Sequence, residues 1–258
     1  MDRLVGGSIH AYETVDSTQT VLARFAREGA PEGTLVSAAH QTVGRGRRGH
    51  RWWDASGDSL LMSILLRPCV TTQETPSLAL VAGLAVADAL EAVATVAARI
   101  RWPNDVLVGG KKISGVLPEA VSGADGRVAY VLLGIGINID QDVFPDDLRD
   151  EAISLRQATG VRHEQGRVRD AVLESLDLRY AEWLSAGFPR LRDAWRRRAC
   201  TLGERVRGAD GTEGVAVDVD DTGALLVDAG HGALARVISS TTALAPSSAR
   251  ARSPSCCS

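Results

Sequence analysis

Hydrophobic positions along the chain change their spacing several times, and each change predicts a different element. After Ser17 the apolar residues recur at helical spacing, and Gly29 with Pro31 interrupts that pattern, so a helix is predicted to about Glu28. Two apolar runs of strand length follow, separated by a polar loop. The runs cover residues 34–39 and 59–66, and the loop covers 41–57.

The middle of the chain carries strands together and helices together. A long alanine- and leucine-rich helix is predicted over 76–96. The β segments are 99–102 with 106–108, 112–121 and 128–139, and the later helices are 151–159, 165–186 and 189–199. This grouping predicts an α+β fold, with a mixed or antiparallel sheet and helices packed on one face.

The pattern changes again from Leu202, where short strands alternate with glycine turns. The strands are predicted at 205–207, 214–219, 224–227 and 233–238. We therefore expect a catalytic-type domain over 1–200, a small SH3-like barrel over 201–246 and a disordered tail over 247–258. The ten residues before the strand at Tyr12 are expected to leave no room for an N-terminal DNA-binding domain.

Composition narrows the class of protein. The chain is 45% hydrophobic with a net charge of −3, it is expected to contain no run of about 18 apolar residues that could span a membrane, and its first residues lack the pattern of a secretory signal. We expect a cytoplasmic protein that binds neither membrane nor DNA. None of the four cysteines has the CxxC spacing of a zinc or redox site.

Charged residues are distributed unevenly. Of the 29 basic residues only Lys111 and Lys112 are lysine. This bias indicates that a compact ammonium group is required at that position. The alternative is that two adjacent lysines were retained by chance on a turn. Residues 44–51 place four arginines among glycines, a pattern typical of a loop that folds around phosphate or carboxylate groups and is mobile when empty. An RNA-binding or merely solvated basic loop is the alternative reading.

A second polar cluster lies between two predicted strands. Asn104 and Asp105 form what is on its own an ordinary turn, but a hairpin at residues 109–110 would bring both beside Lys112. The carboxylate could then hold a magnesium-bound nucleotide or orient the lysine. The glycine-punctuated strand 134–138 matches neither the Walker nor the Rossmann phosphate loop.

Taken in order, these motifs resemble those of bacterial biotin protein ligases of the short form. The resemblance covers residues 12–245 and rests on DSTQ at 16–19, GRGRRG at 44–49, RWPND at 101–105, KISGVL at 112–117 with Glu119, and GIGIN at 134–138. It implies a class II synthetase-like catalytic domain that makes biotinyl-5′-adenylate from biotin and ATP with Mg²⁺. It further implies transfer of biotin to a lysine of a biotin carboxyl carrier domain, and it allows a homodimer.

The resemblance also implies roles for individual residues, with Lys112 and Arg47 as the catalytic pair. The biotin contacts would be Ser17, Thr18, Gln19, Gln41, Arg45, Gly46, Arg47, Lys112 and Gly115. The ATP or adenylate contacts would be Arg45, Arg48, Gly49, Trp52, Asn104, Asp105 and Asn138. Metal ligands stay unassigned. The alternatives are a lipoate or octanoyl ligase with the same acyl-adenylate chemistry, a DNA-binding corepressor and a passive ligand carrier.

Some positions depart from the pattern of the family. Gln19 replaces a common asparagine, Arg101 a frequent lysine and His50 an arginine, while residues 239–242 lack a frequent glycine turn. Pro118 cannot donate a ladder hydrogen bond, which predicts that its strand is at an edge or bulged there.

Overall fold

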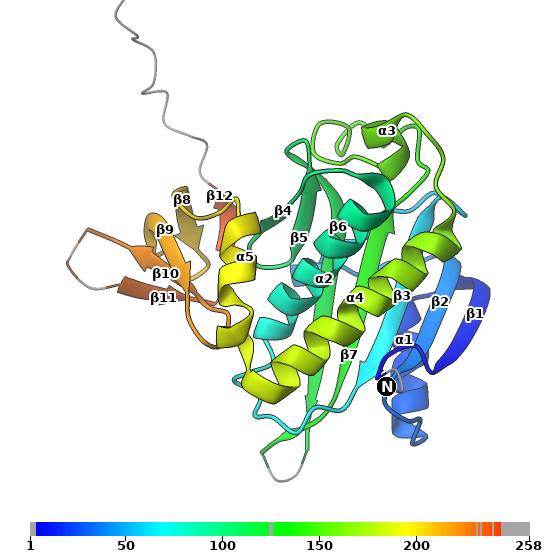
Figure 1. Cartoon of the computed structure of the whole chain (residues 1–258), viewed down its shortest axis with the longest axis horizontal. Helices are drawn as coiled ribbons and strands as arrows, with labels where there is room; N and C mark the ends of the chain where they lie inside the picture. The colour runs from blue at the N-terminus through cyan, green and yellow to red at the C-terminus, as the bar shows by residue number, and fades with distance from the viewer. Residues whose placement is uncertain (1–3, 124–125, 231, 233, 239, 244–258) are drawn as a thin grey trace, which may run out of the picture.

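The computed structural model describes residues 4–123, 126–230, 232, 234–238 and 240–243, and its main feature is a seven-stranded mixed sheet (Figure 1). The strand order is β1-β2-β3-β7-β6-β5-β4, with β1 and β2 parallel and the other neighbours antiparallel. The mixed sheet expected from the sequence is confirmed. The strands are β1 (Ser8–Val15), β2 (Thr34–Gln41), β3 (Ser59–Leu66), β4 (Ala98–Arg101), β5 (Asp105–Val108), β6 (Lys111–Ser122) and β7 (Val128–Asn138).

Helices cover both faces of this sheet, not one as expected. Figure 1 shows α2 (Ser77–Ala94) and α4 (Gln165–Ala186) crossing the near face, and α5 (Arg192–Arg198) beside them. The helix α1 (Thr18–Arg27) instead packs Leu22 and Ala26 against Val36 and Leu65, a cluster separate from the main core. Adjacent strand residues point to opposite faces, so β3 is buried along its whole length. The short helices are η1 (Arg47–Gly49), α3 (Leu155–Thr159) and η2 (Phe188–Arg190).

The expectation that the chain has no apolar stretch long enough to cross a membrane is wrong for the helix α2. Its 18 residues have a mean hydropathy of 1.8, so this stretch is long and apolar enough to cross a membrane by length and composition alone. In the fold 72% of it is buried, and it lies against α4 and the sheet. That is the position of a core helix in a globular domain.

The strand β6 changes its surroundings halfway along. Residues 111–115 pair with β5, pairing with β7 begins at Ser114, and beyond Gly115 the ladder partner is β7. Pro118 therefore sits where β6 is an edge, as its missing donor predicts.

A second sheet follows the helices. It contains β8 (Arg205–Gly208), β9 (Glu213–Val219), β10 (Leu225–Asp228), β11 (Leu234–Val237) and β12 (Ser240–Ala243), in the antiparallel order β11-β10-β9-β8-β12. A small antiparallel β domain is thereby confirmed. The predicted tail 247–258 and Ser239 lie outside the described residues.

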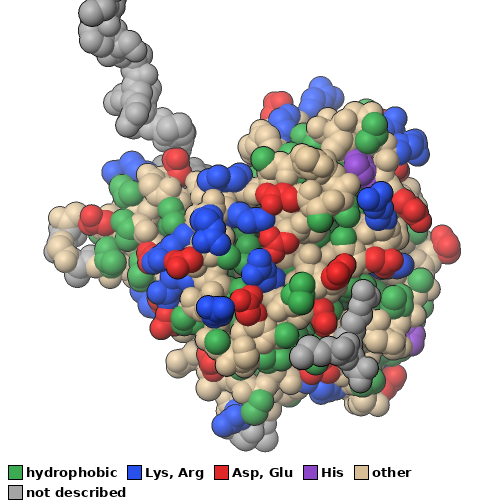
Figure 2. All heavy atoms as spheres, in the orientation of Figure 1, with side chains coloured by type: hydrophobic (Ala, Val, Ile, Leu, Met, Phe, Trp, Pro, Cys, Tyr) green, Lys and Arg blue, Asp and Glu red, His purple; other side chains and the backbone are tan. Residues whose placement is uncertain are grey.

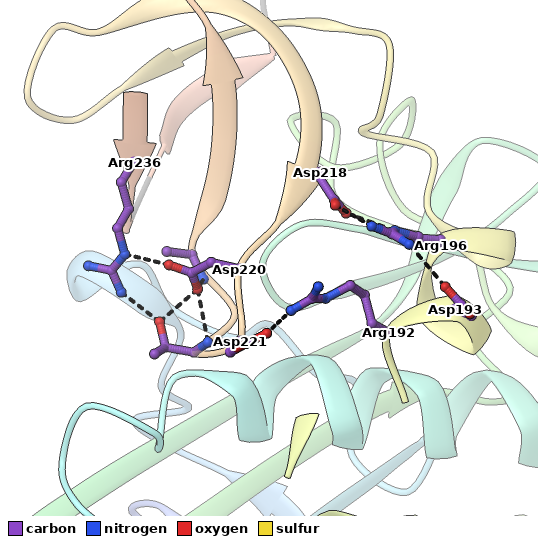
Figure 3. A network of polar contacts seen from close by, with 9 residues as sticks. Arg192, Asp193, Arg196, Asp218, Asp220, Asp221 and Arg236 are labelled. Carbon is purple, nitrogen blue, oxygen red and sulfur yellow. Dashed lines mark hydrogen bonds and ion pairs between the residues drawn. The ribbon is translucent and has the colours of Figure 1, made fainter. Parts of the chain in front are cut away.

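Hydrogen bonds and ion pairs attach this β domain to the rest of the chain. The indole of Trp102 donates to the carbonyl of Gly223 at 2.9 Å, and its backbone N–H donates to Thr201 Oγ1 at 2.8 Å. From α5, Arg196 pairs with Asp218, as Figure 3 shows. These contacts hold the β domain beside the turn 102–105.

The Arg196–Asp218 pair predicts a pH-dependent part of the stability. The hydrogen bond from Arg196 is the main cause that lowers the pKa of the Asp218 carboxyl, against the opposing effect of burial. A carboxyl with a depressed pKa in the folded chain stabilises above its unfolded pKa and stops doing so as pH falls through the folded one. We expect Asp218→Asn to lower the melting temperature at neutral pH, and the difference from wild type to shrink progressively as the pH falls below about 3.9, the ordinary pKa of an aspartate. A difference that stays undiminished in calorimetry as the pH is lowered through the acid range would contradict this assignment.

Candidate functional site

A cavity of about 250 Å³ lies on the face of the sheet that carries α1. Figure 2 shows the opposite face, over α2 and α4, where basic and acidic side chains are intermixed. The walls come from the start of α1, the end of β2, the loop that carries η1, and strands β5, β6 and β7. Segments distant in sequence thus converge on one cavity.

One end of the cavity is a fixed set of polar groups. Ser17, Thr18 and Gln19 are each less than 5% exposed at the beginning of α1. The side-chain amide oxygen of Gln41, Oε1, accepts from the Thr18 backbone N–H at 2.8 Å and from the Thr18 hydroxyl at 3.1 Å. The same hydroxyl lies 2.7 Å from Ser63 Oγ. Such a buried, interlocked set suits a small ligand with its own hydrogen-bonding groups.

Gln19 ties this polar end to the sheet. Its amide nitrogen donates to the carbonyls of Leu117 at 3.1 Å and Leu132 at 3.3 Å. It lies over Gly134, where an added Cβ would come within 2.9 Å of Gln19 Cδ. The glycine is therefore needed for the glutamine to reach both strands.

The hairpin predicted at residues 109–110 is confirmed, and it brings the second polar cluster together. Both glycines have positive φ, 59° and 82°, and Leu107 pairs with Lys112 across the turn. The Lys112 ammonium lies 2.6 Å from Asp105 Oδ1, while Arg101 Nη2 lies 2.8 Å from Asp105 Oδ2. The carboxylate thus orients the lysine at the wall of the cavity.

The arginine-glycine loop brings further positive charge to the same wall. Arg47 donates to Asn104 Oδ1 at 3.4 Å. Burial lowers the pKa of the Arg47 guanidinium, and the neighbouring Arg48 lowers it further, while Asp105 acts in the opposite direction. A half-buried guanidinium with a second one beside it favours an anion, since an anion would relieve both effects.

Trp52 occupies the space that the glycines of β6 and β7 leave open. A Cβ on Gly136 would lie 2.6 Å from the Trp52 ring, and one on Gly115 would lie 3.0 Å from it. The Lys112 ammonium stands 5.7 Å from the centre of the same ring. The indole nitrogen is buried and has no hydrogen-bond partner among the described residues. Gly115 and Gly136 therefore leave room for the Trp52 side chain.

This packing gives a prediction for Gly136→Ala. The new methyl group has no room beside the indole, so we expect Trp52 to swing out and the tryptophan emission to shift to longer wavelength. The free energy of unfolding should fall by no more than about 3 kcal/mol, the usual upper cost of overpacking. Gly7→Ala is the matched control, because a Cβ there meets no atom within 4 Å. A shift that persists in a Trp52→Phe background would contradict the assignment.

Three residues expected at the site are placed differently. Asn138 is 4% exposed and is absent from the cavity wall; its amide donates to the Ile153 carbonyl at 3.2 Å, beside the backbone of Lys112. Gly49 is absent from the wall of this cavity and lines a second pocket, together with Leu117 and Glu119. Arg45 reaches the cavity, but its guanidinium pairs with Glu119. The other expected residues all line the cavity.

A supporting pair next to Gln41 was not predicted from the sequence. The Asp54 side chain is 1% exposed and accepts a hydrogen bond from the Gln41 backbone N–H at 3.4 Å. His40 Nδ1 lies 2.8 Å from the same carboxylate. An aspartate directly after two tryptophans is a weak signal, because only the fold brings residues 40 and 54 together.

Comparison with known proteins identifies the class that this fold and cavity define. The chain matches the Biotin/lipoate A/B protein ligase family over residues 11–138 and the biotin protein ligase C-terminal domain over 201–241. It is 39% identical to the bifunctional ligase/repressor BirA of Bacillus spizizenii, over 89% of this chain and 72% of that protein. It is 34% identical to the biotin–[acetyl-CoA-carboxylase] ligase of Mycobacterium tuberculosis, over 84% and 82%.

A solved structure agrees with these relatives. The biotin protein ligase of Aquifex aeolicus, in complex with biotin and ATP, superimposes with a TM-score of 0.78 at 29% identity, over 90% of this chain and 96% of that one. The chain therefore belongs to the biotin protein ligase family.

Proposed function

We propose that this chain is an ATP-dependent biotin–[biotin carboxyl carrier protein] ligase that works in two steps. A carboxylate oxygen of biotin attacks the α-phosphorus of ATP, and pyrophosphate leaves. The ε-amine of a carrier lysine then attacks the carbonyl carbon of the adenylate, AMP leaves and the nitrogen loses a proton. The observation that carries the proposal is the convergence of Lys112, Arg47 and Trp52 beside the polar end at Thr18 and Gln41.

The first step requires two anions to meet. Two unit charges about 4 Å apart repel by about 4 kcal/mol at an effective dielectric constant near 20. Lys112, held by Asp105 at 2.6 Å, supplies a compact positive charge where the two anions would approach each other. Arg47 adds a second, partly buried charge for the phosphate, which stabilises charge that develops during attack.

The second step requires that water be kept away, since a mixed anhydride hydrolyses. Trp52 lies against Gly136 and Gly115 and covers the inner part of the cavity. We assign it the role of excluding water from the adenylate. Ser17, Thr18 and Gln41 are assigned to the ureido head of biotin, with Gln19 holding the start of α1, which carries Ser17 and Thr18, against the sheet.

Mg²⁺ fits the site as an ion bound mainly by substrate. Asp105 is the one acidic residue among the described residues that line the cavity, and magnesium sites in nucleotide enzymes often use one carboxylate with phosphate oxygens and water. The ion would supply charge neutralisation on the phosphates. Asp105 already pairs with Lys112 and Arg101, yet a carboxylate has lone pairs for a further ligand.

The acceptor in this proposal is the biotin carboxyl carrier domain of a carboxylase, and the reaction is cytoplasmic. The position of the β domain supports a role in docking the acceptor. Trp102 donates a hydrogen bond to this domain, and Trp102 is close in sequence to the cavity residues Asn104 and Asp105, so the domain lies next to the cavity. The lipoate alternative is not favoured, since the named relatives and structural neighbours are biotin ligases. Sedimentation with and without biotin and ATP would measure whether the homodimer that the family resemblance allows is formed.

The test of transfer uses a carrier domain and its variant with the acceptor lysine changed to arginine. With biotin, ATP and Mg²⁺ we expect the mass of one biotinyl group on the normal carrier and none on the variant. Replacement of biotin by lipoate or octanoate should give no product. Equal modification of both carriers, or a product with lipoate, would contradict the proposal.

A further inference from the structure

A bidentate ion pair joins the arginine-glycine loop to β6. Arg45 Nη1 donates to Glu119 Oε2 at 3.1 Å, and Arg45 Nη2 lies 2.9 Å from Glu119 Oε1. The two residues are 74 positions apart, so the pair is a tertiary contact. A planar guanidinium matched to both carboxylate oxygens fixes orientation as well as distance.

The loop's own hydrogen bonds cannot attach it to the opposite wall. Gly46 N–H donates to the His50 carbonyl at 2.8 Å and Trp52 N–H donates to the Gly44 carbonyl at 3.1 Å, so both bonds stay within the loop. Arg47 crosses to Asn104, but at 3.4 Å. The Arg45–Glu119 pair is the shorter of these two crossings and engages two oxygens instead of one.

The charges indicate that Arg45 acts through Glu119. Its guanidinium is neutralised by the Glu119 carboxylate, and both side chains are partly exposed. Arg47 and Lys112, which we assigned to the phosphate, instead contact Asn104 and Asp105 at the cavity wall. The sequence resemblance implied a direct ligand contact for Arg45, which this pairing does not favour.

We propose that Arg45 and Glu119 form a latch that holds the loop closed and sets how long the acyl-adenylate stays in the cavity. Both are positioning residues, and Glu119 has no other part in the site described above. The inference rests on the proposed function, since the adenylate is the ligand retained. An exposed pair shifts an equilibrium by about two- to fivefold and is screened by salt.

The test is a charge swap with two measurements. Arg45→Glu and Glu119→Arg are expected to release preformed biotinyl-5′-adenylate about two- to fivefold faster, and the double variant should return to within about twofold of wild type. Glu119→Gln, which keeps the shape of the side chain, should also speed release, and wild type should approach it as salt increases. Arg156→Glu is the matched control, because Arg156 pairs with Asp142 away from the cavity wall.

The second measurement is hydrogen exchange of residues 44–52 in the ligand-free protein, which does not depend on catalysis. We expect faster exchange in the single variants and recovery in the double variant. A double variant as fast as Arg45→Glu in release would show that Arg45 contacts the adenylate directly and would overturn the latch. Unchanged exchange in Glu119→Gln would overturn it too. If hydrogen exchange changes as expected in the variants but the wild-type protein forms no adenylate, the proposed function is refuted and the latch is not.

Discussion

Lys112→Arg is expected to lose more than about tenfold of the rate of adenylate formation, although the charge is kept. The ammonium is confined between Asp105 at 2.6 Å and the Trp52 ring at 5.7 Å. A planar guanidinium is larger and directional, so it cannot serve as a point charge between two anions in the same space. Pyrophosphate release under single-turnover conditions measures the rate.

Lys111→Arg is the matched control for this variant. Lys111 is the neighbouring lysine, and its ammonium donates to the Arg149 carbonyl at 3.0 Å, outside the cavity wall. Its replacement should leave the rate within about twofold of wild type. Wild-type rates in Lys112→Arg would contradict the role assigned to lysine here.

Arg47→Ala is expected to let the adenylate escape before transfer. The guanidinium is half-buried beside Arg48 and donates to Asn104, so its loss would remove the proposed charged contact to the phosphate as well as a crossing of the loop. A hydrogen bond to a charged group contributes about 1.5–3 kcal/mol, which corresponds to roughly a 10- to 150-fold faster release. Labelling of bystander proteins in a mixture measures the escaped adenylate.

The control for Arg47→Ala is Arg27→Ala on α1. Arg27 is an exposed arginine that donates to its own helix at the Ala23 carbonyl, so the substitution removes a surface charge and one local hydrogen bond away from the cavity wall. Retention of the adenylate by the Arg47 variant, equal to that of the control, would mean that the loop does not hold this ligand.

Local sequence was sufficient to predict the cluster around Lys112. The glycine turn at residues 109–110 fixes a hairpin, and a hairpin fixes which side chains face each other, so the spacing along the chain is enough to place Asp105 beside Lys112. The approximate lengths of the strands and the presence of a small β domain were predicted in the same way, from the apolar runs and the glycine turns between them.

Contacts between distant segments could not be predicted. The position of Trp52 over Gly136 depends on how the loop folds back, and nothing in the spacing of those residues specifies it. The pairing of Arg45 with Glu119 also depends on loop geometry, because an arginine near a phosphate site is compatible with either partner. The placement of α1 on the far face depends on the parallel β1–β2 connection, which short apolar runs do not reveal.

Biotin-dependent exchange of labelled pyrophosphate into ATP tests the central claim most directly, because it requires reversible formation of the adenylate and no carrier protein. With ATP and Mg²⁺ we predict exchange that depends on biotin, is absent with lipoate, and falls by more than about tenfold in Lys112→Arg. Mass detection should identify biotinyl-5′-adenylate in the same mixture. Binding of biotin without any exchange would contradict the account and leave a ligand carrier in its place.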